Sequence, residues 1–67
     1  MKVTLKALRV NLGLTQQEMA EKLGVNLRTW QNYENFITFP DAKIIDKILK
    51  MANVSYDDII FFKSDYI

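Results

Sequence analysis

The hydrophobic residues of this chain recur at helical spacing in short segments separated by turn-forming residues. In the first segment, residues 4–11, Leu5 and Leu8 lie three positions apart and therefore share one face of a helix. Gly13 comes after the last residue of this pattern, where a left-handed residue can close a helix. We therefore predict a first helix over about residues 4–11.

A second helix is predicted to begin at Thr15. Thr15 and Glu18 have the spacing of a capping box, in which each side chain satisfies a free backbone N–H of the first turn. The helix should end at Gly24, and its inner face should comprise Met19, Ala20 and Leu23.

A third helix is predicted from Asn26, a residue type that favours the N-cap, to about Asn35. Trp30 and Tyr33, three positions apart, are its large apolar residues, and helical spacing favours core packing over a base-stacking platform for single strands. The next residues, aromatic and β-branched up to Pro40, predict a loop, because the residue before proline disfavours helix.

A fourth helix is predicted over about residues 41–52, with Asn53 supplying a left-handed turn. Its inner face should comprise Ile44, Ile45, Ile48 and Leu49, and its outer, solvated face Lys43, Lys47 and Lys50. Ser55 and Asp58 repeat the capping-box spacing, which predicts a short fifth helix containing Ile59, Ile60 and Phe61. Asp57 and Asp58 are then first-turn acids of that helix and not metal ligands.

The length of the chain indicates a single domain over residues 1–67, and the five predicted helices place that domain in the all-α class. The 67 residues include no Cys and no His, so the usual zinc sites and the Ser–His or Cys–His nucleophile pairs cannot be built. No stretch approaches the roughly 20 apolar residues that span a bilayer. We expect a cytoplasmic binding domain without enzymatic activity, metal or cofactor.

The net charge of +1 is a weak guide to a partner, but its distribution is informative. Residues 1–34 contain five basic and three acidic residues, whereas residues 35–67 contain four basic and five acidic ones. An anion-binding surface is therefore expected in the first half.

Residues 16–35 have the pattern of two helices that meet at a sharp angle across a short turn. Ala20 is small enough for close helix approach, and Gly24 occupies the turn, where a side chain would be strained. The corner is closed by apolar residues at Met19, Leu23, Val25, Trp30 and Tyr33. The alternative is a helical hairpin with no affinity for DNA.

With this pattern the chain resembles the helix-turn-helix domains of the lambda-repressor/Cro type, also called the xenobiotic-response-element family. The resemblance covers about residues 4–62. It rests on Arg9, the run LTQQEMA at residues 14–20, Gly24-Val25, Tyr33-Glu34-Asn35, Pro40 and the run VSYDD at residues 54–58. It implies a five-helix bundle whose second and third helices bind DNA, in a transcriptional regulator that binds its operator as a dimer.

The third helix should read bases in the major groove. If Trp30 and Tyr33 face inward, the outward residues are Leu27, Arg28, Gln31 and Asn32, with Asn26 at the edge. Arg28 suits guanine, Gln31 or Asn32 suits adenine, and Leu27 suits a thymine methyl. The resemblance implies base contacts for Asn26, Leu27, Arg28 and Asn32, whereas polar residues merely solvated on a helix face are the alternative.

Phosphate contacts are expected at the N-terminus of the second helix, whose free N–H groups and dipole favour an anion. The candidates are Thr15 and Gln16, with Gln16 also implied by the resemblance, together with Gln17 and, from the end of the third helix, Asn35. The resemblance also implies a buried, structural salt bridge between Arg9 and Glu34.

The leading hypothesis is a sequence-specific regulator of transcription that binds double-stranded DNA, a bacterial or phage repressor acting as a homodimer that forms in solution or only on DNA. Where the resemblance implies a loop with Gly and basic residues, this chain has the apolar segment Phe36-Ile37-Thr38-Phe39. The alternative is therefore a protein-interaction module, such as an antitoxin or a partner-sensing regulator, that docks a partner through residues 36–39 or the apolar C-terminal tail Ile59 to Phe62.

Overall fold

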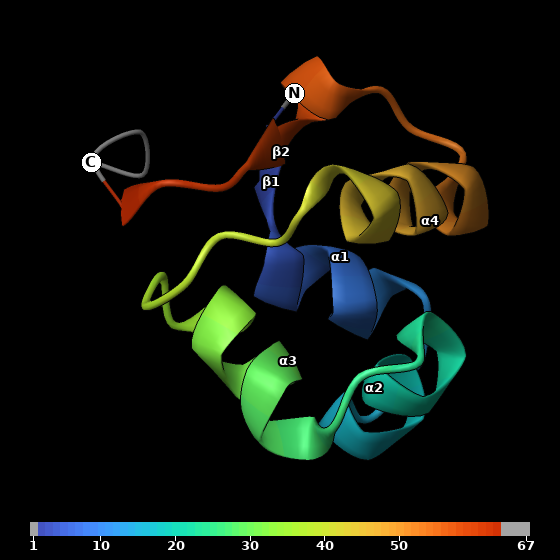
Figure 1. Ribbon diagram of the computed structural model, residues 1–67. Coiled ribbons are helices and arrows are strands. Elements are labelled where there is room, and N and C mark those ends of the chain that lie inside the picture. The colour runs from blue at the N-terminus through green and yellow to red at the C-terminus, as the bar shows by residue number, and fades with distance from the viewer. Residues whose placement is uncertain (1, 64–67) are drawn as a thin grey trace.

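The computed structural model describes residues 2–63 and places four α-helices, two short strands and one 3₁₀ turn in them. Figure 1 shows α2 and α3 at one end of the molecule, with the two strands toward the other end and α1 between the strands and these two helices. The elements are β1 (Val3–Thr4), α1 (Leu5–Asn11), α2 (Gln16–Leu23), α3 (Leu27–Glu34), α4 (Ala42–Ala52), the 3₁₀ turn Tyr56–Asp58 and β2 (Ile59–Ile60).

Each α-helix begins after a residue whose side-chain oxygen accepts a hydrogen bond from the backbone N–H three positions later. The donor–acceptor distances are 2.8–3.1 Å, and the four N-caps are Thr4, Thr15, Asn26 and Asp41. The starts predicted at Thr15 and Asn26 are confirmed, including the reciprocal capping box of Thr15 and Glu18. Local hydrogen bonding therefore fixes where the helices begin.

The predicted helix ends are also confirmed. Gly24 and Asn53 have left-handed backbone conformations, with φ of 76° and 55°, and they are the C-caps of α2 and α4. The segment between α3 and α4 is a loop, as predicted, in which Phe36 has a φ of 60°.

The core gathers apolar residues from all four helices and from β2. Trp30 lies at its centre with no exposed surface, and its ring meets that of Tyr33 edge-on at a centroid distance of 6.1 Å. The buried apolar residues are Leu5, Leu8, Met19, Ala20, Leu23, Trp30, Ile44, Ile48, Ile59 and Phe61. The prediction that Trp30 is a core residue is confirmed.

The predicted fifth helix is wrong, whereas the mostly helical, all-α class of the fold holds, with four α-helices in residues 2–63. Asp58 Oδ2 accepts hydrogen bonds from the backbone N–H and the hydroxyl of Ser55 at 2.9 and 3.0 Å, but the two residues begin a single 3₁₀ turn after which the chain becomes extended. Ile59 and Ile60 form β2, which pairs in parallel with β1 in the register Val3↔Ile59 and Thr4↔Ile60. The run of β-branched and aromatic residues favours an extended strand, and β1 offers it a backbone partner.

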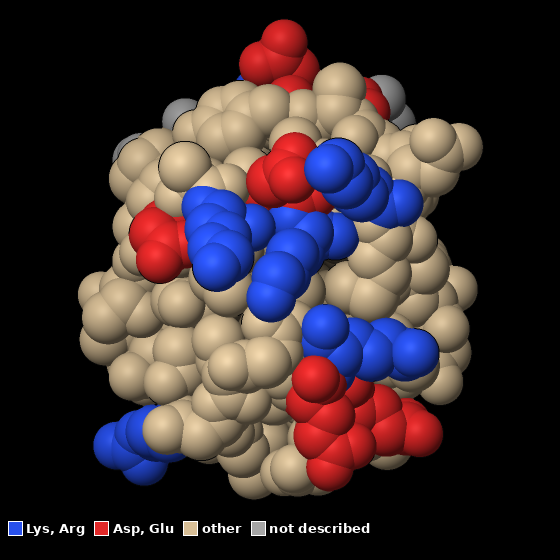
Figure 2. All heavy atoms as spheres, turned by 45° about the vertical axis from the view of Figure 1, so that its right-hand side comes forward, with Lys and Arg blue, Asp and Glu red and all other residues tan. Residues whose placement is uncertain are grey.

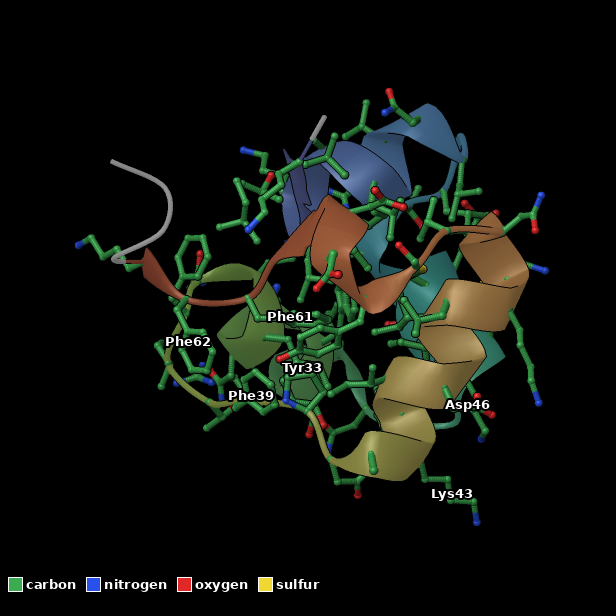
Figure 3. The ribbon with its side chains drawn as sticks, turned by 90° about the horizontal axis from the view of Figure 1, so that it is seen from above. Tyr33, Phe39, Lys43, Asp46, Phe61 and Phe62 are labelled. Atoms are coloured by element: carbon green, nitrogen blue, oxygen red, sulfur yellow. The ribbon has the colours of Figure 1, made fainter. Side chains whose placement is uncertain are left out.

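An aromatic cluster joins the loop after α3 to the segment after β2. The ring of Phe39 stacks on that of Phe62 at 4.9 Å and lies 5.3 Å from that of Phe61, so the three side chains converge in Figure 3. Phe61 also stacks on Tyr56 at 5.1 Å. Of the apolar tail Ile59 to Phe62, to which the sequence assigned a partner contact, Ile59 and Phe61 are buried and Phe62 is 50% exposed. The residues beyond Lys63 lie outside the described part of the chain.

We predict that Gly24→Ala lowers the free energy of unfolding by about 1 kcal/mol, because an L side chain is strained at positive φ. The added Cβ would meet only Lys47 Nζ at 3.7 Å, an ordinary contact, so the loss comes from the backbone. Gly24→Asn should lose less, since asparagine tolerates this conformation. Chemical denaturation measures the free energy of unfolding of the two variants. An equal loss of stability in both would contradict the backbone explanation.

Candidate nucleic-acid interface

The turn between α2 and α3 holds the two helices at a fixed angle. It comprises the three residues 24–26, and Val25 donates its backbone N–H to the carbonyl of Ala20 at 3.0 Å. Lys47 on α4, predicted only to face solvent, also donates from Nζ to the carbonyl of Leu23 at 3.2 Å. This cation satisfies a free acceptor at the negative end of the α2 dipole.

The first turn of α3 presents the side chains predicted to read bases. Leu27 and Arg28 are exposed, and the Arg28 guanidinium has no hydrogen-bond or ion-pair partner within residues 2–63. Asn26 is exposed too, but its Oδ1 accepts the N–H of Thr29 as the helix cap, so only its amide NH₂ stays available. The α3 surface is therefore open at its N-terminal end.

One turn further along α3, Gln31 and Asn32 are half-buried. Gln31 donates from Nε2 to Oε1 of Gln16 on α2 at 3.2 Å. A base-reading candidate and a phosphate-binding candidate thus contact each other, which sequence reasoning did not predict.

The carboxylate of Glu34 is the centre of a buried polar network. Arg9 Nε lies 2.5 Å from Glu34 Oε2, so the structure contains the ion pair that the family resemblance implied, with side-chain exposures of 12% and 3%. Trp30 Nε1 also donates to Oε2, and Gln16 Nε2 donates to Oε1 at 3.1 Å. Side chains from three different helices therefore donate hydrogen bonds to one buried carboxylate.

The remaining phosphate-binding candidates differ in what they can still donate. The backbone N–H of Thr15 is used by Glu18 Oε1 at 2.9 Å, and Gln17 donates from Nε2 to Glu21 Oε2 at 3.2 Å. Asn35 is exposed as the C-cap of α3. The donors best placed at this end of α2 are thus the first-turn backbone N–H groups and the second amide hydrogen of Gln16.

Charge on the neighbouring surface is mixed. Figure 2 shows the side of the molecule where α2 and α4 lie, with Lys and Arg side chains interspersed among Asp and Glu. Lys50 and Asp46 form an exposed ion pair at 3.1 Å there. The described part of the chain has no cluster of three or more residues suited to hold a metal ion, and none of its helices is long and apolar enough to cross a membrane.

Two helices joined by a tight turn, the second with an open outer face, define a helix-turn-helix unit. A family model described as a helix-turn-helix domain matches residues 4–60. The chain belongs to this family, in agreement with the lambda-repressor/Cro resemblance.

Similar curated proteins include regulators from archaea and bacteria. An uncharacterized HTH-type transcriptional regulator of Methanocaldococcus jannaschii is 37% identical over 97% of this chain and 98% of its own length. The HTH-type transcriptional regulator ImmR of Bacillus subtilis and the antitoxin PezA of Streptococcus pneumoniae are each 38% identical over 84% of this chain. These two matches cover only 44% and 35% of the longer relatives. No solved structure matches the chain significantly.

We predict that Arg9→Met destabilises the fold by about 3 kcal/mol, because it leaves the Glu34 carboxylate buried without its cation. The exposed pair provides the control, since Lys50→Met should change stability by less than about 1 kcal/mol. The double variant Arg9→Met/Glu34→Leu should be more stable than the sum of the single losses predicts. Urea denaturation of these three variants and of the single variant Glu34→Leu measures the losses, and additive losses of Arg9→Met and Glu34→Leu would refute the coupling.

We also predict a pH dependence at the start of α2. The Thr15 backbone N–H and hydroxyl lower the pKa of Glu18, so the capping box stabilises the fold above the ordinary glutamate pKa. That contribution is lost as the pH falls through the lower, folded-state pKa. In an NMR titration, Thr15→Ala should raise the pKa of Glu18, whereas Thr15→Ser should leave it lowered. An unchanged Glu18 pKa in Thr15→Ala would show that the Thr15 hydroxyl does not lower it.

Proposed function

We propose that this chain is a sequence-specific DNA-binding regulator of transcription that inserts α3 into the major groove. The observation that supports this most is the contrast between the two sides of α3. Trp30 is completely buried on one side, whereas Leu27 and Arg28, which has no partner within residues 2–63, are exposed on the other. A helix anchored in this way can present side chains to base edges without deforming. The regulators among its relatives point to the same function.

Each outward side chain of α3 has a role that its chemistry suggests. Arg28 would donate two parallel hydrogen bonds to guanine O6 and N7, and Leu27 would contact a thymine methyl. Gln31 and Asn32 have the donor and acceptor that adenine requires, and the Asn26 amide can donate at the edge of the contact.

Phosphate contacts would fix the register of α3 in the groove. Gln16 and the free N–H groups of the first α2 turn would approach the backbone at one end, with Thr15 and Gln17 beside them. Asn35, exposed at the other end of α3, would contact it from there. Contacts at both ends would hold the helix in one orientation.

We expect two copies to bind a two-fold symmetric operator, with half-sites about one helical turn apart. Such a pair would repress transcription by occupying DNA that other proteins need. A regulator of this kind acts where bacterial, archaeal or phage DNA lies, which is the cytoplasm.

A specific surface supports a second candidate function, a protein-interaction module. Ile37, Phe39 and Phe62 are 67%, 43% and 50% exposed, and the last two are joined by stacking. Apolar side chains gathered beside a binding face are typical of protein contacts. The 38% identity to an antitoxin agrees with this alternative.

Selection of bound duplexes from a random pool, at a stated salt concentration, distinguishes the two functions. A regulator should enrich one palindromic sequence with a fixed half-site spacing. An interaction module would recover no preferred sequence and would bind a protein partner tightly instead.

We predict that Arg28→Ala weakens binding to the selected sequence by about 10-fold or more, with a much smaller effect on random DNA. Arg28→Lys retains the positive charge but loses the bidentate geometry, so it should preserve random binding and still lose specificity. Equilibrium titrations of both duplexes measure this. Equal losses on both duplexes would assign Arg28 to phosphate binding.

A further inference from the structure

We propose that Glu34 orients the side-chain amide of Gln31 through Gln16, and that this orientation makes Gln31 select adenine over guanine. The inference rests on the proposed function and extends it to a residue that does not touch DNA. Glu34 is in this sense a positioning residue for base recognition.

The series of hydrogen bonds begins at the carboxylate of Glu34, which cannot act as a donor. An ionised carboxylate only accepts hydrogen bonds, so Glu34 Oε1 requires the NH₂ end of the Gln16 amide, which lies 3.1 Å away. The carboxylate is itself fixed, because Arg9 and the Trp30 indole donate to its other oxygen and its side chain is 3% exposed. The Gln16 amide therefore has one favourable orientation.

The orientation of Gln16 then determines that of Gln31. With its NH₂ group on Glu34, Gln16 turns its Oε1 toward α3 and accepts from Gln31 Nε2 at 3.2 Å. An amide turned the other way would place two oxygens against each other. Gln31 is left with a free Oε1 acceptor and one free N–H.

This set of free groups distinguishes the two purines. In the major groove adenine presents an N7 acceptor beside an N6 donor, which one N–H and one oxygen match. Guanine presents two acceptors, N7 and O6, which suit a reversed amide that offers its NH₂ group. By preventing that reversal, the Glu34–Gln16 contact disfavours guanine at the base pair that Gln31 meets.

Gln16 also connects two kinds of contact. One of its two N–H bonds is used by Glu34 and its oxygen by Gln31, so the second N–H remains for a phosphate. The side chain that locates the DNA backbone thus also orients a side chain that reads a base.

The test compares two neighbouring glutamines. Gln16→Leu removes the connection, whereas Gln17→Leu, the matched control, removes a neighbouring phosphate-binding candidate and its exposed contact with Glu21. Both variants are expected to lose affinity, and only the preference between bases distinguishes them. Gln31→Ala first identifies the operator position that Gln31 reads, by selection from the random pool. We expect a roughly tenfold preference for adenine over guanine there in the wild type. It should fall to about threefold or less in Gln16→Leu and persist in Gln17→Leu.

A second readout needs no DNA. In the free protein, Gln16→Leu should shift the side-chain amide resonances of Gln31 in an NMR spectrum, and Gln17→Leu should leave them in place. Gln16→Met serves if the leucine variant does not fold.

The outcomes separate the inference from the function on which it rests. Loss of affinity in Gln16→Leu without loss of the adenine preference would limit Gln16 to phosphate binding and overturn the inference alone. An unchanged Gln31 amide would overturn it as well. A wild-type chain that selects no sequence overturns the inference together with the proposed function, whatever the amide resonances show.

Discussion

The structure depends most on the buried carboxylate of Glu34. A charge removed from water is strongly unfavourable unless donors surround it. Here the donors come from three helices: Arg9 from α1, Gln16 from α2 and Trp30 from α3 itself. The carboxylate is satisfied only when these helices stand in one mutual arrangement, so it fixes the helix-turn-helix unit against the rest of the domain.

The same requirement determines which face of α3 is exposed. Burial of apolar surface is not directional, and a large ring such as that of Trp30 could pack in more than one rotation of a short helix. The hydrogen bonds that Glu34 accepts from Arg9 on α1 and Gln16 on α2 supply the missing direction. Leu27 and Arg28 face outward because Trp30 and Glu34 face inward.

The parts of the fold that sequence predicts are those encoded by neighbouring residues. The caps at Thr15 and Asn26 act over three positions, and the helices begin where they predict. Ser55 acts over the same distance, but the pairing of Ile59 with Val3, at the other end of the chain, makes the next residues extended rather than helical. Because the two strands are far apart in the sequence, no pattern among neighbouring residues predicts that they pair.

In the candidate site too, some features can be predicted from neighbouring residues and others depend on contacts between helices. The outward position of Arg28 can be predicted from helical spacing, whereas the contact of Gln16 with Gln31 requires the angle between two helices. A glutamine amide has both donors and an acceptor, so sequence alone leaves its partner undetermined. The Trp30–Glu34 hydrogen bond had a detectable signal, because the two residues lie one turn apart on the same helix.

The mixed charge of the surface bears on how such a domain would achieve specificity. Affinity from phosphate neutralisation grows with the number of cations that face the DNA, and it is the same for every sequence. A chain with a net charge of +1 and acids among its lysines has little of this contribution. Its discrimination would then rest on a few base contacts, and under the proposed binding of two copies to one operator the effect of those contacts would be multiplied. Under that condition the fixed orientation of each side chain on α3 matters more than the total charge.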